Sequence, residues 1–326
     1  MLIDLFFIVL GAFLLAASLV VALRRFSLKK NVLVRHGVSV LGGAAVGLAF
    51  IFACILGFLR ESNFSWETAG IIVSSSIMLI FGLLDDWKEL SVVNKFAVEF
   101  LATFCLIAFG VRTHIVYLAD TGNIIITFIW VIGITNALNH LDVVDGVAGA
   151  ITLSAAAAFF VISLLVANTQ IQIMTLALLG AVLGFMLFNF PPAKIYMGSS
   201  GSHFLGFVLA AISLAIGYAD LGREIALLSP LLILGFHIFD TTFLIVVRTS
   251  QGRSAFKKSD DHLALRFLKL GFSKRKTLLL MLGLSLVFSF AGVFISQAPN
   301  ILGLSMLIFL FVISLVLAKH MGFTHV

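Results

Sequence analysis

The sequence contains few charged residues, and this scarcity excludes most classes of soluble protein. Charged residues make up 11% of its 326 positions, hydrophobic residues make up 61%, and the mean hydropathy is +1.17. Soluble domains carry roughly 25% charged residues, so this chain has too little polar surface to cover a water-soluble particle. Its apolar residues form long blocks, many close to the about 20 residues that span a bilayer as a helix. The composition therefore predicts an integral membrane protein.

Cysteine is scarce as well, which argues against two kinds of framework. Cys54 and Cys105 both lie inside apolar runs, and the sequence contains no CxxC motif and no Cys/His cluster. The spacing predicts neither a disulfide framework nor a zinc site. Residues 1–23 have no basic stretch before their apolar run, so we expect a retained helix there and not a cleaved signal peptide.

About eleven apolar blocks are long enough to predict membrane-spanning helices. They cover approximately residues 3–23, 40–59, 68–84, 92–110, 123–141, 147–167, 171–190, 203–219, 225–247, 277–296 and 301–318. If the N-terminus lies outside, the outward loops hold only Arg60, Arg112 and Arg223 of the 21 lysines and arginines. Basic residues favour the cytoplasmic side of a membrane, so topology explains the net charge of +6 without a nucleic-acid partner.

These patterns predict an all-α, polytopic membrane protein with about 11 transmembrane helices, its N-terminus outside and its C-terminus in the cytoplasm. The sequence shows no soluble appendage and no internal repeat, so we expect residues 1–326 to form a single domain in the inner (plasma) membrane. The 33 phenylalanines would face lipid or a second copy of the chain, which leaves a homodimer open.

Acidic residues gather at the predicted cytoplasmic ends of the helices. They are Asp85 and Asp86 in FGLLDDWKEL, Asp142 and Asp145 in NALNHLDVVDG, Asp240 in HIFDTT, and Asp260 and Asp261 in the large basic loop. Acids at a membrane boundary are costly unless they are paired or used. Each could be a solvated helix end, but the adjacent Asp85 and Asp86 repel each other unless a cation is near. We interpret the group as a candidate site on the cytoplasmic face.

Asn136, Asn139, Asp142 and Asp145 recur at every third position. This spacing places them on a slowly drifting stripe of one helix face. Their side chains offer oxygen donors, which suit a hard cation such as Mg²⁺. The alternative is an Asn-rich helix terminus whose side chains only cap the backbone.

Two further segments have both an ordinary and a functional interpretation. In PPAKIYMGSSGSHFLGF the prolines end a helix, and the Gly/Ser stretch lets backbone N–H groups approach an anion, although such stretches are often plain turns. The basic loop KKSDDHLALRFLKLGFSKRK contains His262 and Arg266. It reflects membrane topology and contact with anionic lipid, or it clamps phosphates.

Together these segments resemble the polyprenyl-phosphate N-acetylhexosamine-1-phosphate transferase family over nearly the whole chain. LLDDWKELSVVNK is similar to its Asp-Asp segment, with Lys95 at the downstream lysine, and NALNHLDVVDGVAG resembles its NxxNxxDGxDG element. PAKIYMGSSGS, with Lys194, resembles PAKxFMGDxGS, and HIFDTTFLIVVR, with Arg248, resembles PxFDTxxxxxxR. KSDDHLALRFLKLGFS resembles the histidine-bearing loop.

The chain departs from the family pattern at several positions. Ser199 stands where the family has the aspartate that is implied to bind Mg²⁺, and a serine hydroxyl is a poor ligand for this ion. The HxHH cluster is reduced to His262, with Ala264 and Leu265 at its other histidine positions. Val143 replaces the first glycine of DGxDG, and VSVLGG lacks the usual Pro-Arg.

The resemblance implies an enzyme that transfers a sugar-1-phosphate, by default N-acetylglucosamine-1-phosphate, from a UDP-N-acetylhexosamine to a polyprenyl phosphate such as undecaprenyl phosphate. UMP would be released and a cell-envelope glycan begun. The residues implied as catalytic are Asp85, Asp86, Asp142, Asp145 and Asp240. Those implied to bind substrate are Lys95, Asn136, Lys194, Arg248, His262 and Arg266. Asn139 and the position of Ser199 are implied to hold Mg²⁺, or Mn²⁺ in its place.

Two other functions stay open at this point. A catalytically silent relative would bind lipid phosphate or nucleotide sugar without turnover, and Ser199 is the residue that keeps this alternative alive. A transporter would place its acids near the bilayer midplane, at broken helices. Most acids here fall at the predicted membrane boundary, which favours an enzyme that works at the interface.

Overall fold

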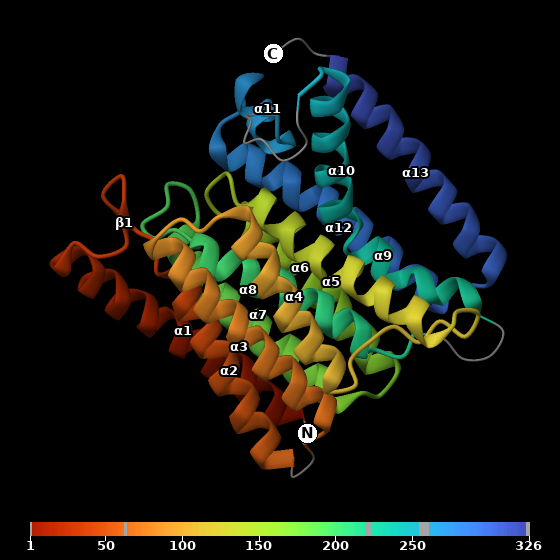
Figure 1. The fold of residues 1–326 in the computed structure, drawn as a ribbon, viewed down its shortest axis with the longest axis horizontal. Coiled ribbons are helices and arrows are strands. Elements are labelled where there is room, and N and C mark those ends of the chain that lie inside the picture. The colour runs from red at the N-terminus through yellow and green to blue at the C-terminus, as the bar shows by residue number, and fades with distance from the viewer. Residues whose placement is uncertain (1, 62–63, 219–222, 254–260, 324–326) are drawn as a thin grey trace.

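The computed structural model describes residues 2–61, 64–218, 223–253 and 261–323, and helices make up nearly all of this part of the chain (Figure 1). The helices are α1 (Leu2–Lys30), α2 (Gly42–Glu61), α3 (Trp66–Trp87), α4 (Val92–Ala108), α5 (Asp120–Leu141), α6 (Val147–Leu165), α7 (Thr169–Asn189), α8 (Gly198–Ala215), α9 (Ser229–Ile233), α10 (Gly235–Ser250), α11 (Leu263–Lys269), α12 (Lys274–Gln297) and α13 (Asn300–Phe323). A 3₁₀ helix, η1 (Glu224–Leu228), precedes α9, and a short antiparallel hairpin joins β1 (Val34–Arg35) to β2 (Val38–Ser39).

Nine of the described helices are long and apolar enough to cross a membrane, namely α1, α2, α3, α5, α6, α7, α8, α12 and α13. The segment η1–α9 and helix α10 make a tenth crossing if they form one span, bent by 64°. The all-α, polytopic prediction is therefore confirmed. Helix α4, expected as a span over 92–110, has only 17 residues, and the full count of eleven rests on it.

Local sequence explains the sharp corner between α3 and α4. The hydroxyl of Ser91 caps the start of α4 by accepting from Asn94 N. Ser and Thr are preferred at this position because they satisfy an N–H group that the helix leaves without a partner. Between the two helices, Asp85 accepts a hydrogen bond from Leu90 N at 2.9 Å. The corner thus holds Asp85 and Asp86 at the very end of α3.

Helix α8 lies at the centre of the fold, where it packs against α2, α3 and α5. Small residues permit the closest approaches. A Cβ atom on Gly82 of α3 would lie 2.3 Å from the Cα of Ser200, and one on Gly206 would lie 2.8 Å from the Cα of Thr135. The backbones of α3, α5 and α8 therefore meet directly, and this brings their polar ends together.

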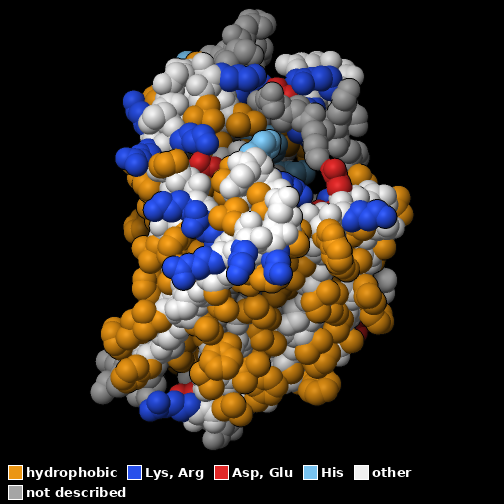
Figure 2. All heavy atoms as spheres, turned by 90° about the vertical axis from the view of Figure 1, so that its left-hand side faces the viewer, with side chains coloured by type: hydrophobic (Ala, Val, Ile, Leu, Met, Phe, Trp, Pro, Cys, Tyr) orange, Lys and Arg blue, Asp and Glu red, His pale blue; other side chains and the backbone are white. Residues whose placement is uncertain are grey.

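Helices α1–α8 form the main bundle, and α10–α13 lie along one side of it (Figure 1). Most of the lower half of the face in Figure 2 is hydrophobic, as expected of a surface in contact with lipid, whereas lysine and arginine side chains gather on its upper half. This basic end is also the end at which α3 and α5 terminate and α4 and α8 begin; it is called the site end below.

Candidate active site

Asp85 and Lys95 come together at the corner of α3 and α4. Lys95 Nζ lies 2.7 Å from Asp85 Oδ2, and Asp85 is almost fully buried. Lys95 keeps a quarter of its side chain exposed. The corner thus presents a positive charge to solvent, held by a buried carboxylate behind it.

Asp86 bridges α3 to the start of α8. Its Oδ1 accepts from Ser199 N at 2.8 Å, and its Oδ2 accepts from Ser200 N at 3.0 Å. The backbone N–H groups at a helix start attract a negative charge, so Asp86 supplies the anion that the Gly/Ser stretch was predicted to approach. Gly198 is required beside it, because its φ is +73° and a Cβ atom there would lie 2.6 Å from Asp86 Oδ2. Arg35 of β1 lies 3.9 Å from the same carboxylate.

The loop before α8 is fixed by the segment before α2. Tyr196 N donates to Ser39 O at 2.8 Å, and Gly43 N donates to Met197 O at 2.8 Å. A Cβ atom on Gly43 would lie 2.0 Å from Gly201 N, so the two segments touch backbone to backbone. The glycines of VSVLGG, although they lack the family's Pro-Arg, thus position the Gly/Ser loop.

The end of α5 contributes Asn139 and Asp142 to the same region. Asn139 Oδ1 accepts from the Ser202 hydroxyl at 2.8 Å. Asp142 is half-buried, and no hydrogen bond joins its carboxylate to any part of the chain that the structure describes. Burial, together with the negative charges of Asp86 and Asp145, raises the pKa of Asp142 to about 7. The nearby carboxylates of Asp86 and Asp145 thus disfavour the ionised form of Asp142.

Asp145 and Lys194 lie at the edge of this group. Asp145 Oδ2 accepts from Lys274 Nζ at 3.0 Å and from Ala193 N at 3.3 Å, which ties the start of α12 to the loop after α7. Lys194 is exposed, and its carbonyl oxygen accepts from Arg24 Nε at 2.9 Å. This contact uses the Lys194 backbone and does not fix the position of its side chain.

A second polar group forms where α10 meets α11. Asp240, fully buried, accepts from Leu263 N at 3.2 Å, and its Oδ2 lies 3.6 Å from His262 Nδ1. The ring of His262 lies 6.1 Å from that of His140 on α5, measured between centroids. Helix α5 therefore connects this group to the acidic one.

Arg248 and Arg266 are both buried in the second group. Arg266 donates to Met321 O at 2.7 Å and to Asp261 O at 3.2 Å, and its guanidinium lies 5.4 Å from the ring centroid of Phe243. These contacts join α11 to α10 and α13. Of the remaining acids predicted in this loop, Asp261 pairs with Arg253 at 2.7 Å, and Asp260 lies outside the described residues.

Three ionisable residues of the site end were not predicted from the sequence. Glu99, His140 and His203 each carry a buried atom that has no hydrogen-bond partner within the described chain. A signal was available, because Glu99 and His203 interrupt apolar helix stretches, and an ionisable residue inside a membrane segment is by default a candidate for function.

The residues of the acidic group fit a hard divalent cation. Asp86, Asn139, Asp142 and Ser199 all offer oxygen donors, and the Asp142 carboxylate itself pairs with no cationic side chain among the described residues. No three His, Cys, Asp or Glu side chains in the described ranges converge as a ready-made cage. Mg²⁺ needs no such cage, because it usually keeps several waters and takes one or two carboxylates together with substrate phosphates.

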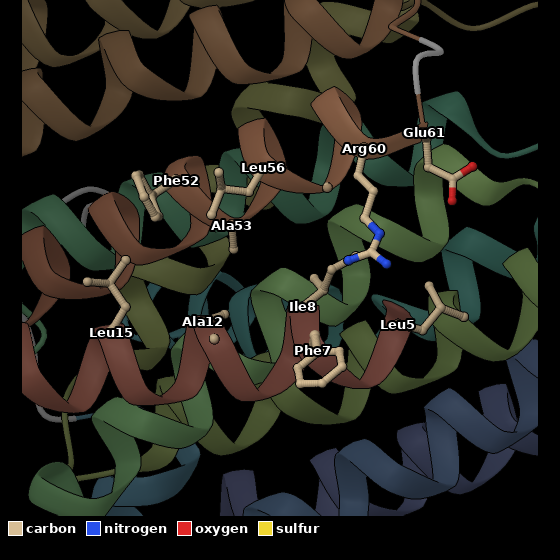
Figure 3. A pocket seen from close by; sticks show the side chains of 12 residues that line it. Leu5, Phe7, Ile8, Ala12, Leu15, Phe52, Ala53, Leu56, Arg60 and Glu61 are labelled. Atoms are coloured by element: carbon tan, nitrogen blue, oxygen red, sulfur yellow. The ribbon is translucent and has the colours of Figure 1, made fainter. Parts of the chain in front are cut away.

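An apolar pocket of about 400 Å³ lies at the opposite end of the bundle, between α1 and α2 (Figure 3). Leu5, Ile8, Phe52 and Leu56 contribute to its walls, and Arg60 lies at its rim. It contains none of the predicted site residues, so we place the active site with the carboxylates and not in this pocket.

The fold and the site define a polytopic membrane protein whose acidic and basic side chains converge at one end of its helix bundle, suited to anionic substrates. The sequence model of glycosyl transferase family 4 matches residues 68–217, which carry the Asp-Asp, Asn/Asp and Gly/Ser segments. The chain belongs to this family, and the resemblance to polyprenyl-phosphate N-acetylhexosamine-1-phosphate transferases is confirmed.

Three relatives illustrate the similarity. The chain is 28% identical to the probable undecaprenyl-phosphate N-acetylglucosaminyl 1-phosphate transferase of Bacillus subtilis, over 85% of this chain and 79% of the relative. It is 31% identical to the decaprenyl-phosphate N-acetylglucosaminephosphotransferase of Mycobacterium leprae, over 74% and 69% of the two chains. It is 29% identical to the undecaprenyl-phosphate alpha-N-acetylglucosaminyl 1-phosphate transferase of Thermotoga maritima, over 76% and 75%.

Proposed function

We propose that the chain transfers a sugar-1-phosphate from a UDP-sugar to a polyprenyl phosphate and releases UMP. N-acetylglucosamine-1-phosphate and undecaprenyl phosphate are the proposed substrates, because both occur in the names of the Bacillus subtilis and Thermotoga maritima relatives. The observation that carries the proposal is the contact of Asp86 and Asn139 with the start of α8. Asp142 lies close enough to Asp86 for their charges to interact, and Lys95 pairs with the neighbouring Asp85.

In the proposed reaction an oxygen of the lipid phosphate attacks the β-phosphorus of the UDP-sugar. A new P–O bond forms there while the bond to the α-phosphate oxygen breaks, and UMP leaves. Phosphoryl transfer needs positioning and charge neutralisation more than covalent chemistry. Lys95, held by Asp85, supplies positive charge to the phosphates. Asn136, Arg248 and His262 would contact the substrates.

Asn139, Asp142 and the Ser199 hydroxyl would hold a divalent cation, Mg²⁺ or Mn²⁺. The cation supplies charge neutralisation to the diphosphate. The ionised form of Asp142 is disfavoured in the isolated protein, since its pKa is raised to about 7. The oxygen donors around it thus offer a site whose negative charge a cation would offset.

We propose further that the N-terminus lies outside, that α4 completes eleven crossings, and that the site end faces the cytoplasm of a cell bounded by this membrane. The concentration of basic side chains at the site end supports this orientation. Substrates of both kinds could then meet there, with the nucleotide in water and the lipid tail in the bilayer.

The test is UMP release by the purified protein in detergent, with UDP-N-acetylglucosamine and undecaprenyl phosphate, in Mg²⁺ or in EDTA. We expect release that requires both the lipid phosphate and the metal, and a loss of about tenfold or more in Lys95→Met. UMP release with a different UDP-sugar, and not with UDP-N-acetylglucosamine, would identify that other sugar nucleotide as the donor. No release from any UDP-sugar would contradict turnover by this chain, and activity gained in Ser199→Asp would then identify a catalytically silent relative with a weakened metal site.

A further inference from the structure

One helical turn deeper than the Lys95 and Ser199 positions, two ionisable side chains face each other inside the bundle. Glu99 of α4 is 1% exposed and His203 of α8 is 0% exposed, and Glu99 Oε1 lies 3.7 Å from His203 Nε2. Neither of these two atoms has a hydrogen-bond partner within the described chain. Ionisable groups in such a place are costly unless they are paired or used.

The other polar atoms of both side chains have fixed roles. Asn136 Nδ2 donates to Glu99 Oε2 at 2.7 Å and to Ile132 O at 2.9 Å, which uses both amide hydrogens. Only Asn136 Oδ1 is left to accept from a substrate. His203 Nδ1 lies 3.0 Å from Ser199 O, and because a carbonyl oxygen only accepts, Nδ1 must carry a hydrogen.

These roles determine what lies between the two facing atoms. If Nδ1 carries the hydrogen of a neutral imidazole, Nε2 is an acceptor, and an ionised carboxylate opposite it would be a second acceptor. A hydrogen on either Glu99 Oε1 or His203 Nε2 removes this conflict. The 3.7 Å between the two atoms is longer than a hydrogen bond, so a small approach of the side chains would let them share it. The pair is then neutral as a whole, which lowers the cost of burying it.

The pair also completes the support of Ser199. Side chains hold both polar backbone atoms of this residue, since Asp86 accepts from its N–H and His203 donates to its carbonyl oxygen. In the family pattern the residue here is an aspartate, which a bound metal would itself anchor. Ser199 has only a neutral hydroxyl, so its position depends on the contacts made by Asp86 and His203.

We propose that Glu99 and His203 are positioning residues, a hydrogen-sharing pair that fixes the Asn136 amide and the Ser199 backbone on either side of the substrate site. The expected effect of the pair on the reaction rate rests on the proposed transferase function. It acts through Asn136 and Ser199 and does not touch the reacting atoms.

Two substitutions at Glu99 separate this role from simple packing. Glu99→Gln has nearly the same shape, and its amide accepts from Asn136 while donating to a neutral His203, so it should retain at least about a third of wild-type kcat. Glu99→Met fills the space but makes neither contact, so kcat should fall about tenfold or more, since small misplacements near reacting groups have large effects on rate. KM for UDP-N-acetylglucosamine should change less than kcat.

A control variant and a double-mutant cycle of melting temperatures complete the experiment. Gln172→Met, a buried polar residue at the far end of α7 that donates to Ser163 O, should lower the melting temperature without changing kcat. His203→Leu and Glu99→Met should each lower the melting temperature, and the double variant should lower it by clearly less than the sum, as coupled residues do. This thermal cycle needs no turnover, so it tests the pair even if the wild-type protein releases no UMP.

Three results would each overturn the proposal. The first is additive thermal effects of Glu99→Met and His203→Leu. The second is a wild-type kcat in a folded Glu99→Met protein, and the third is an equal loss of kcat in Glu99→Gln and Glu99→Met.

Discussion

Asp142 has more negative charge around it than its contacts offset. Burial and the charges of Asp86 and Asp145 raise its pKa to about 7, whereas an aspartate in an unfolded chain has a pKa of about 3.9. The folded, cation-free protein therefore binds a proton at Asp142 between these two values, and the unfolded chain does not. Folding and protonation are linked at this residue.

We predict that cation-free protein loses stability as the pH rises from about 4 to about 7 and changes little above that. The sign follows from the raised pKa, because the ionised carboxylate is disfavoured only in the folded state. The test is the melting temperature in detergent with EDTA from pH 5 to 8. Over this range the melting temperature of Asp142→Asn should fall by about 2–4 °C less than that of the wild-type protein. Added Mg²⁺ should reduce the decline in the wild-type protein. An equal decline in Asp142→Asn would assign it to another group.

The sequence predicts the spatial contacts of some residues better than those of others. Lys95 was expected to bind substrate, and the short corner between α3 and α4 brings its Nζ to 2.7 Å from Asp85 Oδ2. Glu99 and His203 are 104 positions apart on different helices. Their contact depends on which faces of α4 and α8 meet, and hydrophobic spacing predicts that a face is buried but not which helix covers it.

At the scale of the element, α11 is held by charged residues of α10 and of α11 itself. Asp240 accepts from its first N–H group, and Arg266 connects it to Asp261 and to Met321 at the end of α13. The donors of Arg266 are thus directed into the protein. The phosphate clamp predicted from the basic loop would have to compete with these contacts.

We predict that Arg266→Met destabilises the protein and leaves substrate affinity nearly intact. Loss of buried hydrogen bonds from a charged group should lower the melting temperature by about 4 °C or more, while KM for UDP-N-acetylglucosamine changes less than about threefold. Lys269→Met, an exposed basic residue of the same helix, is the matched control and should alter neither quantity. A tenfold rise in KM at an unchanged melting temperature would instead support the phosphate clamp.

The elements themselves were largely predictable, and the misses have physical reasons. Long apolar runs predicted the nine described helices that are long and apolar enough to span a bilayer, because the bilayer thickness sets the length of a span. The predicted span 225–247 is broken at Leu234 into α9 and α10, with a bend of 64° that overall hydropathy does not report. The hairpin β1–β2 was not predicted, since it forms against the chain near Ile195, far away in the sequence.

For the whole molecule, the 17-residue helix α4 carries the chain from the site end, where α3 ends, to the opposite end, where Phe109 packs on Trp66 at the start of α3. If α4 crosses the membrane in this way, the α3–α4 corner and the loop before α5 lie on opposite sides, which agrees with the positive-inside distribution of basic residues.

We predict that Lys88→Cys reacts with a membrane-impermeant maleimide only after permeabilisation, whereas Tyr117→Cys reacts in intact spheroplasts. Both positions are exposed in the structure. The background should carry Cys105→Ser, because Cys105 is partly exposed, while Cys54 is buried and can remain. Labelling of both positions from the same side would show that α4 does not cross.

The carboxylate of Asp86 has a consequence for how the molecule releases its product. It already occupies the two backbone N–H groups at the start of α8. A free phosphate could bind these N–H groups only by displacing the Asp86 carboxylate, which is part of the chain and therefore always close by. The helix start therefore offers little net gain to a free phosphate group, whether of UMP or of inorganic phosphate.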